Sequence, residues 1–239
     1  MKYIYGPVQS RRLGFSLGIS LTPYKICDFD CVYCQLGKAI GLTEERKEYV
    51  HPEVIAEELK SWLENNPQEA SSLNYLTLSG LGEPTLNIKI GEVLERIKLI
   101  TKIPIAVITN ASFLKESDVR LSLLNASLIV PSLDAVSPKI FQRINRPHQK
   151  INIEEIINGL IALRKEFKGQ IWLEVMLVSG INDDLRHIKK LKEAIEEISP
   201  DKIQLNSPVR TTAEPDIFGI SESKLKKIKD ILGDKCEII

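Results

Sequence analysis

Three of the four cysteines in this chain lie within one short segment, at Cys27, Cys31 and Cys34, with the spacing C-x3-C-x2-C. Thiolate sulfurs are soft ligands that select zinc, copper(I) or iron–sulfur clusters. The fourth cysteine, Cys236, stands alone near the end of the sequence and is expected to be a buried or idle thiol. A disulfide framework needs paired cysteines and an oxidising compartment, and neither is indicated. The triplet therefore predicts a metal centre.

The identity of this centre depends on the missing fourth ligand. Structural zinc takes four protein ligands, and the nearest other candidate, His51, lies outside the usual short spacing. A cubane cluster held by four cysteines would also need a partner, and Cys236 is far away with no second cysteine beside it. Three cysteines leave one iron of such a cluster open. A non-catalytic zinc or iron–sulfur module is the alternative from another class.

A second candidate site is the sequence Ser-Gly-Leu-Gly-Glu-Pro at residues 79–84. Glycines allow a ligand to approach the main chain closely. Together with exposed carbonyl oxygens, the carboxylate of Glu83 is suited to hold a cationic amine. The alternative interpretation is a strand-to-helix loop without a function.

Both segments must be positioned by the surrounding elements, and the pattern of apolar residues predicts these. Runs of Val, Ile and Leu alternate with amphipathic, charged segments, which is typical of a parallel sheet with crossover helices. We expect strands at 16–21, 75–79, 103–109, 128–133, 171–178 and 202–206. We expect helices at 52–64, 88–100, 113–124, 153–167, 185–198 and 221–232.

Six β–α units fit either a doubly wound sheet or an incomplete barrel, because a closed barrel of this type has eight. In both architectures the catalytic groups gather at the carboxyl ends of the parallel strands. The cysteine segment follows the first predicted strand and the glycine-rich segment follows the second. With no linker, repeat or low-complexity tract, we expect a single domain over residues 1–239, with a short N-terminal extension at 1–15.

The charge and hydropathy of the sequence limit the classes of binding partner. Lysine plus arginine (32) equals aspartate plus glutamate (32), which argues against a large RNA footprint. No apolar run approaches the roughly 20 residues that a bilayer requires, so we expect no membrane partner. The first residues lack the charged head and apolar core of a signal peptide. We therefore expect a cytoplasmic protein.

The order C-x3-C-x-Y-C (residues 27–34) and then G-E-P (residues 82–84) resembles the radical S-adenosylmethionine (SAM) superfamily, over essentially the whole chain. The resemblance implies an α/β fold, a partial (β/α)6 TIM-like barrel with parallel strands. It implies a [4Fe–4S] cluster on Cys27, Cys31 and Cys34, with SAM chelating the fourth iron. It also implies an oxidoreductase-type enzyme that reductively cleaves SAM to a 5′-deoxyadenosyl radical, which abstracts hydrogen from a substrate. A reductant such as a flavodoxin or ferredoxin would supply the electron.

The resemblance also implies roles for individual residues. Gly82 and Glu83 would take the methionine amino group of SAM. Leu81 stands where the family usually has its first glycine, and Gly80 is the candidate for the flexible residue. Tyr33 would pack at the adenine. Further cofactor-binding candidates are the polar residues at the other strand ends, which are otherwise helix caps or turn formers: Asn110, Ser132, Asp134, Asn206 and the stretch from Glu174 to Val178.

Two basic segments remain. Arg143, Arg146 and His148 lie in a long connection after the fourth predicted strand and are suited to bind a carboxylate or phosphate of the substrate. Arg11 and Arg12 precede the first predicted strand, at the end opposite the cysteine segment. For these two arginines, a packing or interface role is at least as well supported as catalysis.

The reaction itself is less constrained. Residues 5–14 and 31–37 resemble a subgroup of uncharacterised iron–sulfur oxidoreductases, distantly similar to wyosine-type tRNA-modifying enzymes. A tRNA base or a protein is therefore the candidate substrate, although wyosine synthases carry a second set of cysteines that this sequence lacks. The alternative is a glycyl-radical-enzyme activase, because a barrel of six units without an auxiliary-cluster domain is similar to those enzymes and admits a protein loop.

Overall fold

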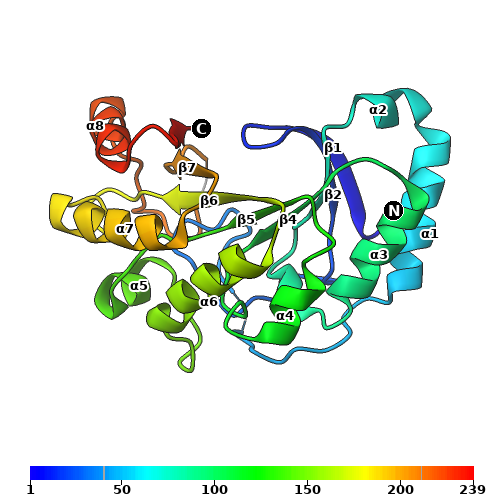
Figure 1. The fold of residues 1–239 in the computed structure, drawn as a ribbon, viewed down its shortest axis with the longest axis horizontal. Helices are drawn as coiled ribbons and strands as arrows, with labels where there is room; N and C mark the ends of the chain where they lie inside the picture. Colours follow the sequence, from blue (N-terminus) through cyan, green and yellow to red (C-terminus); the bar gives the residue numbers. More distant parts are fainter. Residues whose placement is uncertain (40, 211) are drawn as a thin grey trace.

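The computed structural model describes residues 1–39, 41–210 and 212–239. Its strands form one sheet in sequence order, with β1 and β8 at the two edges (Figure 1). The strands are β1 (Ile4–Ser10), β2 (Gly14–Ile19), β3 (Tyr75–Leu78), β4 (Ile105–Thr109), β5 (Leu128–Pro131), β6 (Gln170–Met176), β7 (Lys202–Asn206) and β8 (Cys236–Ile238). β1 pairs with β2 antiparallel, and all later neighbours pair parallel. The sheet is therefore a curved, open barrel of the predicted α/β class.

Helices connect the parallel strands and cover the outer face of the sheet (Figure 1). They are α1 (Pro52–Asn65), α2 (Pro67–Ser72), α3 (Ile90–Ile100), α4 (Ser117–Ser122), α5 (Pro138–Ile144), α6 (Ile153–Glu166), α7 (Leu185–Ile198) and α8 (Glu222–Leu232). A short 3-10 helix at Pro84–Leu86 follows β3. Within the part of the chain that the structure describes, no helix combines the length and apolar character needed to cross a bilayer.

The apolar residues divide between the two faces of the sheet. The main core lies between the sheet and the helices and contains, for example, Leu17 and Ile19 of β2. A smaller cluster joins Leu13 of the β1–β2 turn to Ala106, Leu128 and Val130. Neighbouring residues of a strand point to opposite faces of the sheet. Ser16 and Gly18 of β2 therefore lie on the inner face of the barrel, opposite Leu17 and Ile19. The interior of the barrel is accordingly more polar than the outer layer.

The six predicted strands are confirmed, and the structure adds β1 and β8. Residues 4–10 form β1, although residues 1–15 were expected to be an extension. The helix predicted at 113–124 is shorter and covers only Ser117–Ser122. Arg120 donates from Nη1 to the carbonyl oxygens of Leu114 (2.8 Å) and Lys115 (3.0 Å), which holds the preceding residues in turns. The helix α5 was not predicted and occupies part of the connection after β5.

The turn of the β1–β2 hairpin extends toward the C-terminal strands of the sheet (Figure 1). Arg11 Nη1 donates to the carbonyl oxygen of Ile239 (3.2 Å), next to β8. Arg12 pairs with Glu174 of β6. Both arginines therefore tie the first hairpin to the last strands, and this contact spans the open side of the barrel.

Candidate active site

The cysteine segment lies in the loop between β2 and α1, and its main chain is bonded to the loop after β3. Ile26 N donates to Leu81 O, and Glu83 N donates to Ile26 O, both at 3.0 Å. Cys34 N donates to Cys31 O at 3.0 Å, which forms a tight turn between two of the three thiols. The two candidate motifs of the sequence are thus brought together by backbone hydrogen bonds at the carboxyl ends of β2 and β3.

A second segment supports the cysteine loop from the other side. Residues 144–148, at and after the end of α5, run beside residues 28–32 and pair with them through the main chain. The contacts are Val32 N to Ile144 O (2.9 Å), Asp30 N to Asn145 O (3.1 Å) and His148 N to Asp28 O (2.7 Å). The basic segment that was predicted to bind substrate therefore positions the cysteine loop through its backbone.

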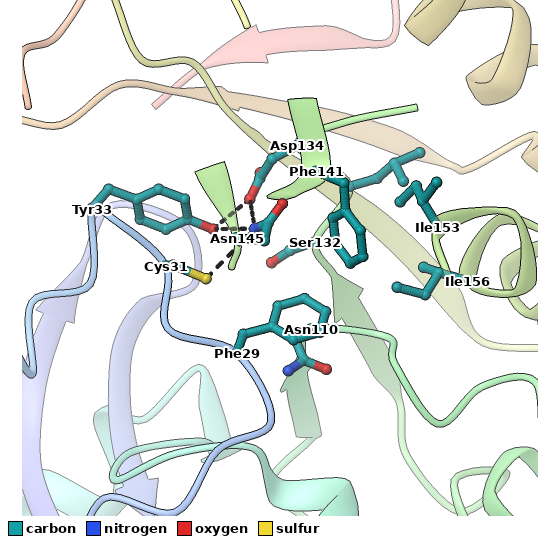
Figure 2. Close-up of a pocket in the computed structure, with 11 residues that line it drawn as sticks. Phe29, Cys31, Tyr33, Asn110, Ser132, Asp134, Phe141, Asn145, Ile153 and Ile156 are labelled. Atoms are coloured by element: carbon teal, nitrogen blue, oxygen red, sulfur yellow. Dashed lines mark hydrogen bonds between the residues drawn. The ribbon is translucent and has the colours of Figure 1, made fainter. Parts of the chain in front are cut away.

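Two cavities adjoin the thiols. The larger has a volume of about 620 Å³, which is within the roughly 300–1,000 Å³ of small-molecule sites. Cys31, Cys34 and Tyr33 line it together with the glycine-rich residues 80–82. The smaller cavity, of about 30 Å³, lies behind Cys31 (Figure 2). Its lining includes the predicted residues Tyr33, Asn110, Ser132 and Asp134.

Four side chains around the smaller cavity form one hydrogen-bonded network (Figure 2). The Tyr33 hydroxyl donates to Asp134 Oδ2, and Asn145 Nδ2 donates to the same oxygen at 2.7 Å. Asn145 Nδ2 also lies 3.5 Å from Cys31 Sγ, within the range of an N–H···S hydrogen bond. Asp134 Oδ1 accepts from Met176 N (2.8 Å), and burial raises the pKa of Asp134 to about 6. The network links β5 and β6 to the cysteine loop.

Glu83 is buried, and its carboxylate bonds within the protein rather than lining the larger cavity. Oε1 accepts from Thr85 Oγ1 (2.5 Å), Thr85 N (3.0 Å) and Thr109 Oγ1 (2.6 Å), and Oε2 accepts from Asn110 N (2.7 Å). Burial raises the pKa of Glu83 despite these bonds. The carboxylate therefore ties the loop after β3 to the end of β4.

Asn110 extends this network to the cysteine loop. Its Nδ2 donates to Asp28 Oδ1 at 2.6 Å and lies 3.9 Å from Cys27 Sγ. Asp28 is fully buried, and burial followed by the nearby carboxylate of Glu83 raises its pKa to about 7. Asp28 Oδ2 is buried without a hydrogen-bond partner. A buried carboxyl group with a raised pKa therefore lies beside the thiol of Cys27, 3.9 Å from its Sγ.

Two of the three thiols, those of Cys27 and Cys31, are held in a poorly solvating environment. Burial raises the pKa of Cys31 to about 12 and raises that of Cys27 well above its ordinary value. A thiol must lose its proton to bind a metal, so a cationic group has to compensate for the burial. Within the described residues, no three or more His, Cys, Asp and Glu side chains converge closely enough to hold a single metal ion.

Of the remaining predicted residues, Met176 in the stretch from Glu174 to Val178 lines the larger cavity, whereas Asn206 and the three basic residues line neither cavity. Asn206 contacts Arg11 and Glu174 inside the barrel. Arg143 donates to Gly180 O (3.1 Å), Arg146 pairs with Glu214 (2.5 Å), and His148 Nδ1 faces Glu44 (3.4 Å). The last three side chains thus contact neighbouring loops, and none of them lines either cavity.

Two residues near the thiols were missed by the sequence analysis. Asn145 lies between the two arginines of the basic segment and was not predicted to be a site residue, because an asparagine in a loop ordinarily indicates only a turn. Arg12 was placed at the opposite end of the strand from the cysteine segment, yet its side chain lines the same cavity as Cys31 and Cys34. The length of an arginine side chain and the path of the hairpin across the barrel explain this proximity.

The family model for the radical SAM superfamily matches residues 21–194. The chain therefore belongs to the radical SAM superfamily and is an enzyme of that class. Membership implies a [4Fe–4S] cluster and SAM as cofactors and the need for a reductant.

Two relatives cover nearly all of the sequence. A UPF0026 protein of Methanocaldococcus jannaschii is 39% identical over 239 residues, which are 100% of this chain and 73% of that protein. A protein of Brachyspira hyodysenteriae described as GTPase Obg is 38% identical over 237 residues, 99% of this chain. The match spans only 34% of that longer protein's length.

Solved structures show the same fold. A radical SAM methyltransferase from Sphaerobacter thermophilus superposes with a TM-score of 0.71 at 18% identity, over 94% of this chain and 65% of that chain. Archaeal TYW1 gives a TM-score of 0.62 at 20% identity, over 92% of this chain and 72% of that chain. At sequence identities this low, the similarity supports only a shared fold. That fold is the partial barrel of radical SAM structures.

The residues of the site fit the implied cofactors. Cys31 and Cys34 are partly exposed on the wall of a cavity of suitable size, and the third thiol lies on the same loop. The main chain of residues 80–82, beside these thiols, lines the cavity without long side chains except that of Leu81. The three soft ligands and the neighbouring open space are the donor set and room that a cluster and an organic ligand need.

The contact between Gly82 and Ile26 leads to a prediction. Gly82 has a φ of +139°, and a Cβ at this position would lie 1.8 Å from Ile26 O. We expect Gly82→Ala to destabilise the protein by about 2 kcal/mol or more and to lower its iron content after reconstitution. Thermal unfolding and iron analysis measure these effects.

Gly37 provides the matched control, because it lies in the cysteine loop that Gly82 contacts, with a φ of +76° and nothing within 4 Å of an added Cβ. Gly37→Ala should cost only about 1 kcal/mol and retain iron. Equal iron content in both variants would contradict the role assigned to the Ile26–Gly82 contact.

Proposed function

We propose that this chain binds a [4Fe–4S] cluster through Cys27, Cys31 and Cys34, binds SAM in the adjoining cavity of about 620 Å³, and removes a hydrogen atom from a substrate that enters this cavity. The observation that carries the proposal is the presence of Cys31 and Cys34 on the same cavity wall as residues 80–82. A bound cluster would supply the electron for cleavage of SAM and so the radical chemistry that removes the hydrogen atom.

The protein's own residues position these groups. The three thiols lose their protons when they bind iron. Glu83 fixes the loop after β3 through its internal hydrogen bonds, which leaves the main chain of Gly80 and Gly82 to take the methionine amino group. Because its hydroxyl is held by Asp134, Tyr33 presents its ring at the boundary of both cavities, where the adenine would pack. Asn110 and Ser132 are the further candidates for polar contacts with SAM.

The substrate we propose is a group on a macromolecule, either a tRNA base or a protein segment. Leu36 and Leu81 line the cavity and are 44% and 37% exposed, so its mouth offers apolar contact to a large substrate. This feature favours a protein segment, as in a glycyl-radical-enzyme activase. A flavodoxin or ferredoxin is the proposed electron donor.

Removal of one thiol tests the proposed reaction. After anaerobic reconstitution with iron and sulfide, followed by reduction and addition of SAM, the wild type should form 5′-deoxyadenosine. Cys31→Ala should reduce this product by more than about 100-fold, because even changes to groups behind a metal ligand cost about 10- to 100-fold. Chromatographic quantification of 5′-deoxyadenosine measures the effect.

Cys236→Ala is the control, because Cys236 is a buried cysteine of β8 that lines neither cavity. It should retain the wild-type yield. If the wild type leaves SAM intact while holding one zinc per chain, the metal-scaffold alternative replaces the proposed reaction. If Cys31→Ala forms as much product as the wild type, the assignment of the ligand is wrong.

The hydrogen bond from Asn145 to Cys31 leads to a second prediction. An N–H···S bond stabilises the extra negative charge of a reduced cluster and so raises its reduction potential. Asn145→Leu should therefore lower the potential by roughly 40 mV, the one-electron equivalent of a hydrogen bond worth about 1 kcal/mol. A redox titration followed by electron paramagnetic resonance (EPR) measures the potential.

The exposed Asn158 of α6 provides the matched substitution. Asn158→Leu should leave the potential unchanged. A potential in Asn145→Leu that equals the wild-type value, with the cluster content intact, would show that the amide does not act on the cluster.

A further inference from the structure

The larger cavity extends from the thiols into the interior of the barrel. Its deeper wall contains Met176 of β6, Ile108 of β4 and Arg12 of the β1–β2 turn. Among the lining residues that the structure describes, only Lys2 and Arg12 carry a formal charge at neutral pH, and both are positive. The cavity that would hold the substrate is therefore cationic apart from its thiols.

Arg12 is held in place by Glu174. The guanidinium Nη2 pairs with Glu174 Oε1, and the same oxygen accepts from Asn206 Nδ2 at 3.2 Å. The Glu174 side chain is only 6% exposed, whereas that of Arg12 is 28% exposed. The carboxylate thus lies behind the guanidinium, and the cation is the member of the pair that faces the cavity.

A second arginine lies beside the network of Arg12, Glu174 and Asn206. Arg11 Nη2 donates to Asn206 Oδ1 at 3.3 Å, so a second guanidinium approaches the same side-chain network. Glu174 therefore serves a network that contains two arginines. A guanidinium carries five N–H donors in a planar fork. Glu174 accepts a hydrogen bond from one of the five donors of Arg12. Nε of Arg12 is buried without a hydrogen-bond partner.

A partly buried cation inside a cavity is costly unless an anion compensates for its lost hydration. The pairing with Glu174 offsets part of this cost and fixes the orientation of the fork. Nη1 of Arg12 has no hydrogen-bond partner among the described residues and is not buried, so its donors remain available to a ligand in the cavity. Arginine suits such a role, because its planar donors bind carboxylate or phosphate oxygens in pairs.

We infer that the inner part of this cavity is a subsite for an anionic group of the substrate, a carboxylate or a phosphate, bound by Arg12 and oriented through Glu174. This inference rests on the proposed function, because it assigns the substrate to the cavity beside the cluster. It makes Arg12 a substrate-binding residue and Glu174 a positioning residue. The subsite selects substrates by charge and sets how deep they enter.

The test uses inorganic phosphate and acetate as probes on the reconstituted protein at constant ionic strength. Titration calorimetry should show saturable binding of at least one probe, and the preferred probe distinguishes a phosphate from a carboxylate subsite. Arg12→Gln should weaken this binding by at least about tenfold. Arg186→Gln is the control, because this exposed arginine of α7 lies outside the cavity lining and should leave the affinity unchanged.

Glu174→Gln separates anion binding from a structural role. This nearly isosteric change removes the competing carboxylate, so it should tighten binding of the same probe several-fold. If Arg12 and Glu174 only fasten the hairpin to β6, both substitutions lower the unfolding temperature and neither changes anion affinity. That result, or the absence of saturable binding in the wild type, would overturn the inference.

The same preparations are assayed for 5′-deoxyadenosine in the absence of substrate. If SAM is cleaved but the anion affinity does not change in Arg12→Gln, the anionic subsite is refuted and the proposed function stands. Absence of SAM cleavage in a wild type that carries its cluster refutes the proposed function, whatever the anion titration shows. The two failures are therefore distinguishable.

Discussion

The site depends on the backbone pairing that holds an irregular loop of three cysteines in place. This loop bonds to residues 81–83 on one side and to residues 144–148 on the other, and both contacts are made by main-chain groups. The pairing keeps Cys31 in a poorly solvated position, where burial raises its pKa to about 12. Such a thiol becomes a good ligand only when a cation compensates for burial, so metal binding and the order of this loop are linked.

The open barrel supplies the second requirement, a cavity that reaches the cysteines from inside the sheet. The β1–β2 hairpin limits this cavity, because its turn crosses to β6 and contributes Arg12 to the interior. Tyr5 of the same hairpin lines the cavity, and its hydroxyl bonds Ser79 Oγ at 2.6 Å. One N-terminal element therefore shapes both the wall beside the glycine-rich loop and the deeper charged region.

Much of this architecture was predictable from the sequence, because buried parallel strands are continuous apolar runs and the cysteine spacing is specific. The strand β8 has only three residues, and α5 is a single seven-residue helix, so neither produces a clear periodic signal. Sequence patterns also do not show which partner a polar side chain takes. The carboxylate of Glu83 bonds within the protein. Asn145 contacts Cys31 because the end of α5 lies beside the cysteine loop, a tertiary contact that no local sequence pattern shows.

The central claim is that a three-cysteine cluster keeps one iron open for SAM beside residues 80–82. EPR spectroscopy of the reduced, reconstituted protein, recorded with and without SAM, tests it most directly. The account predicts a [4Fe–4S]⁺ signal whose g values change when SAM is added, because SAM binds the iron that no cysteine occupies. A four-iron cluster whose signal is identical with and without SAM would contradict the claim.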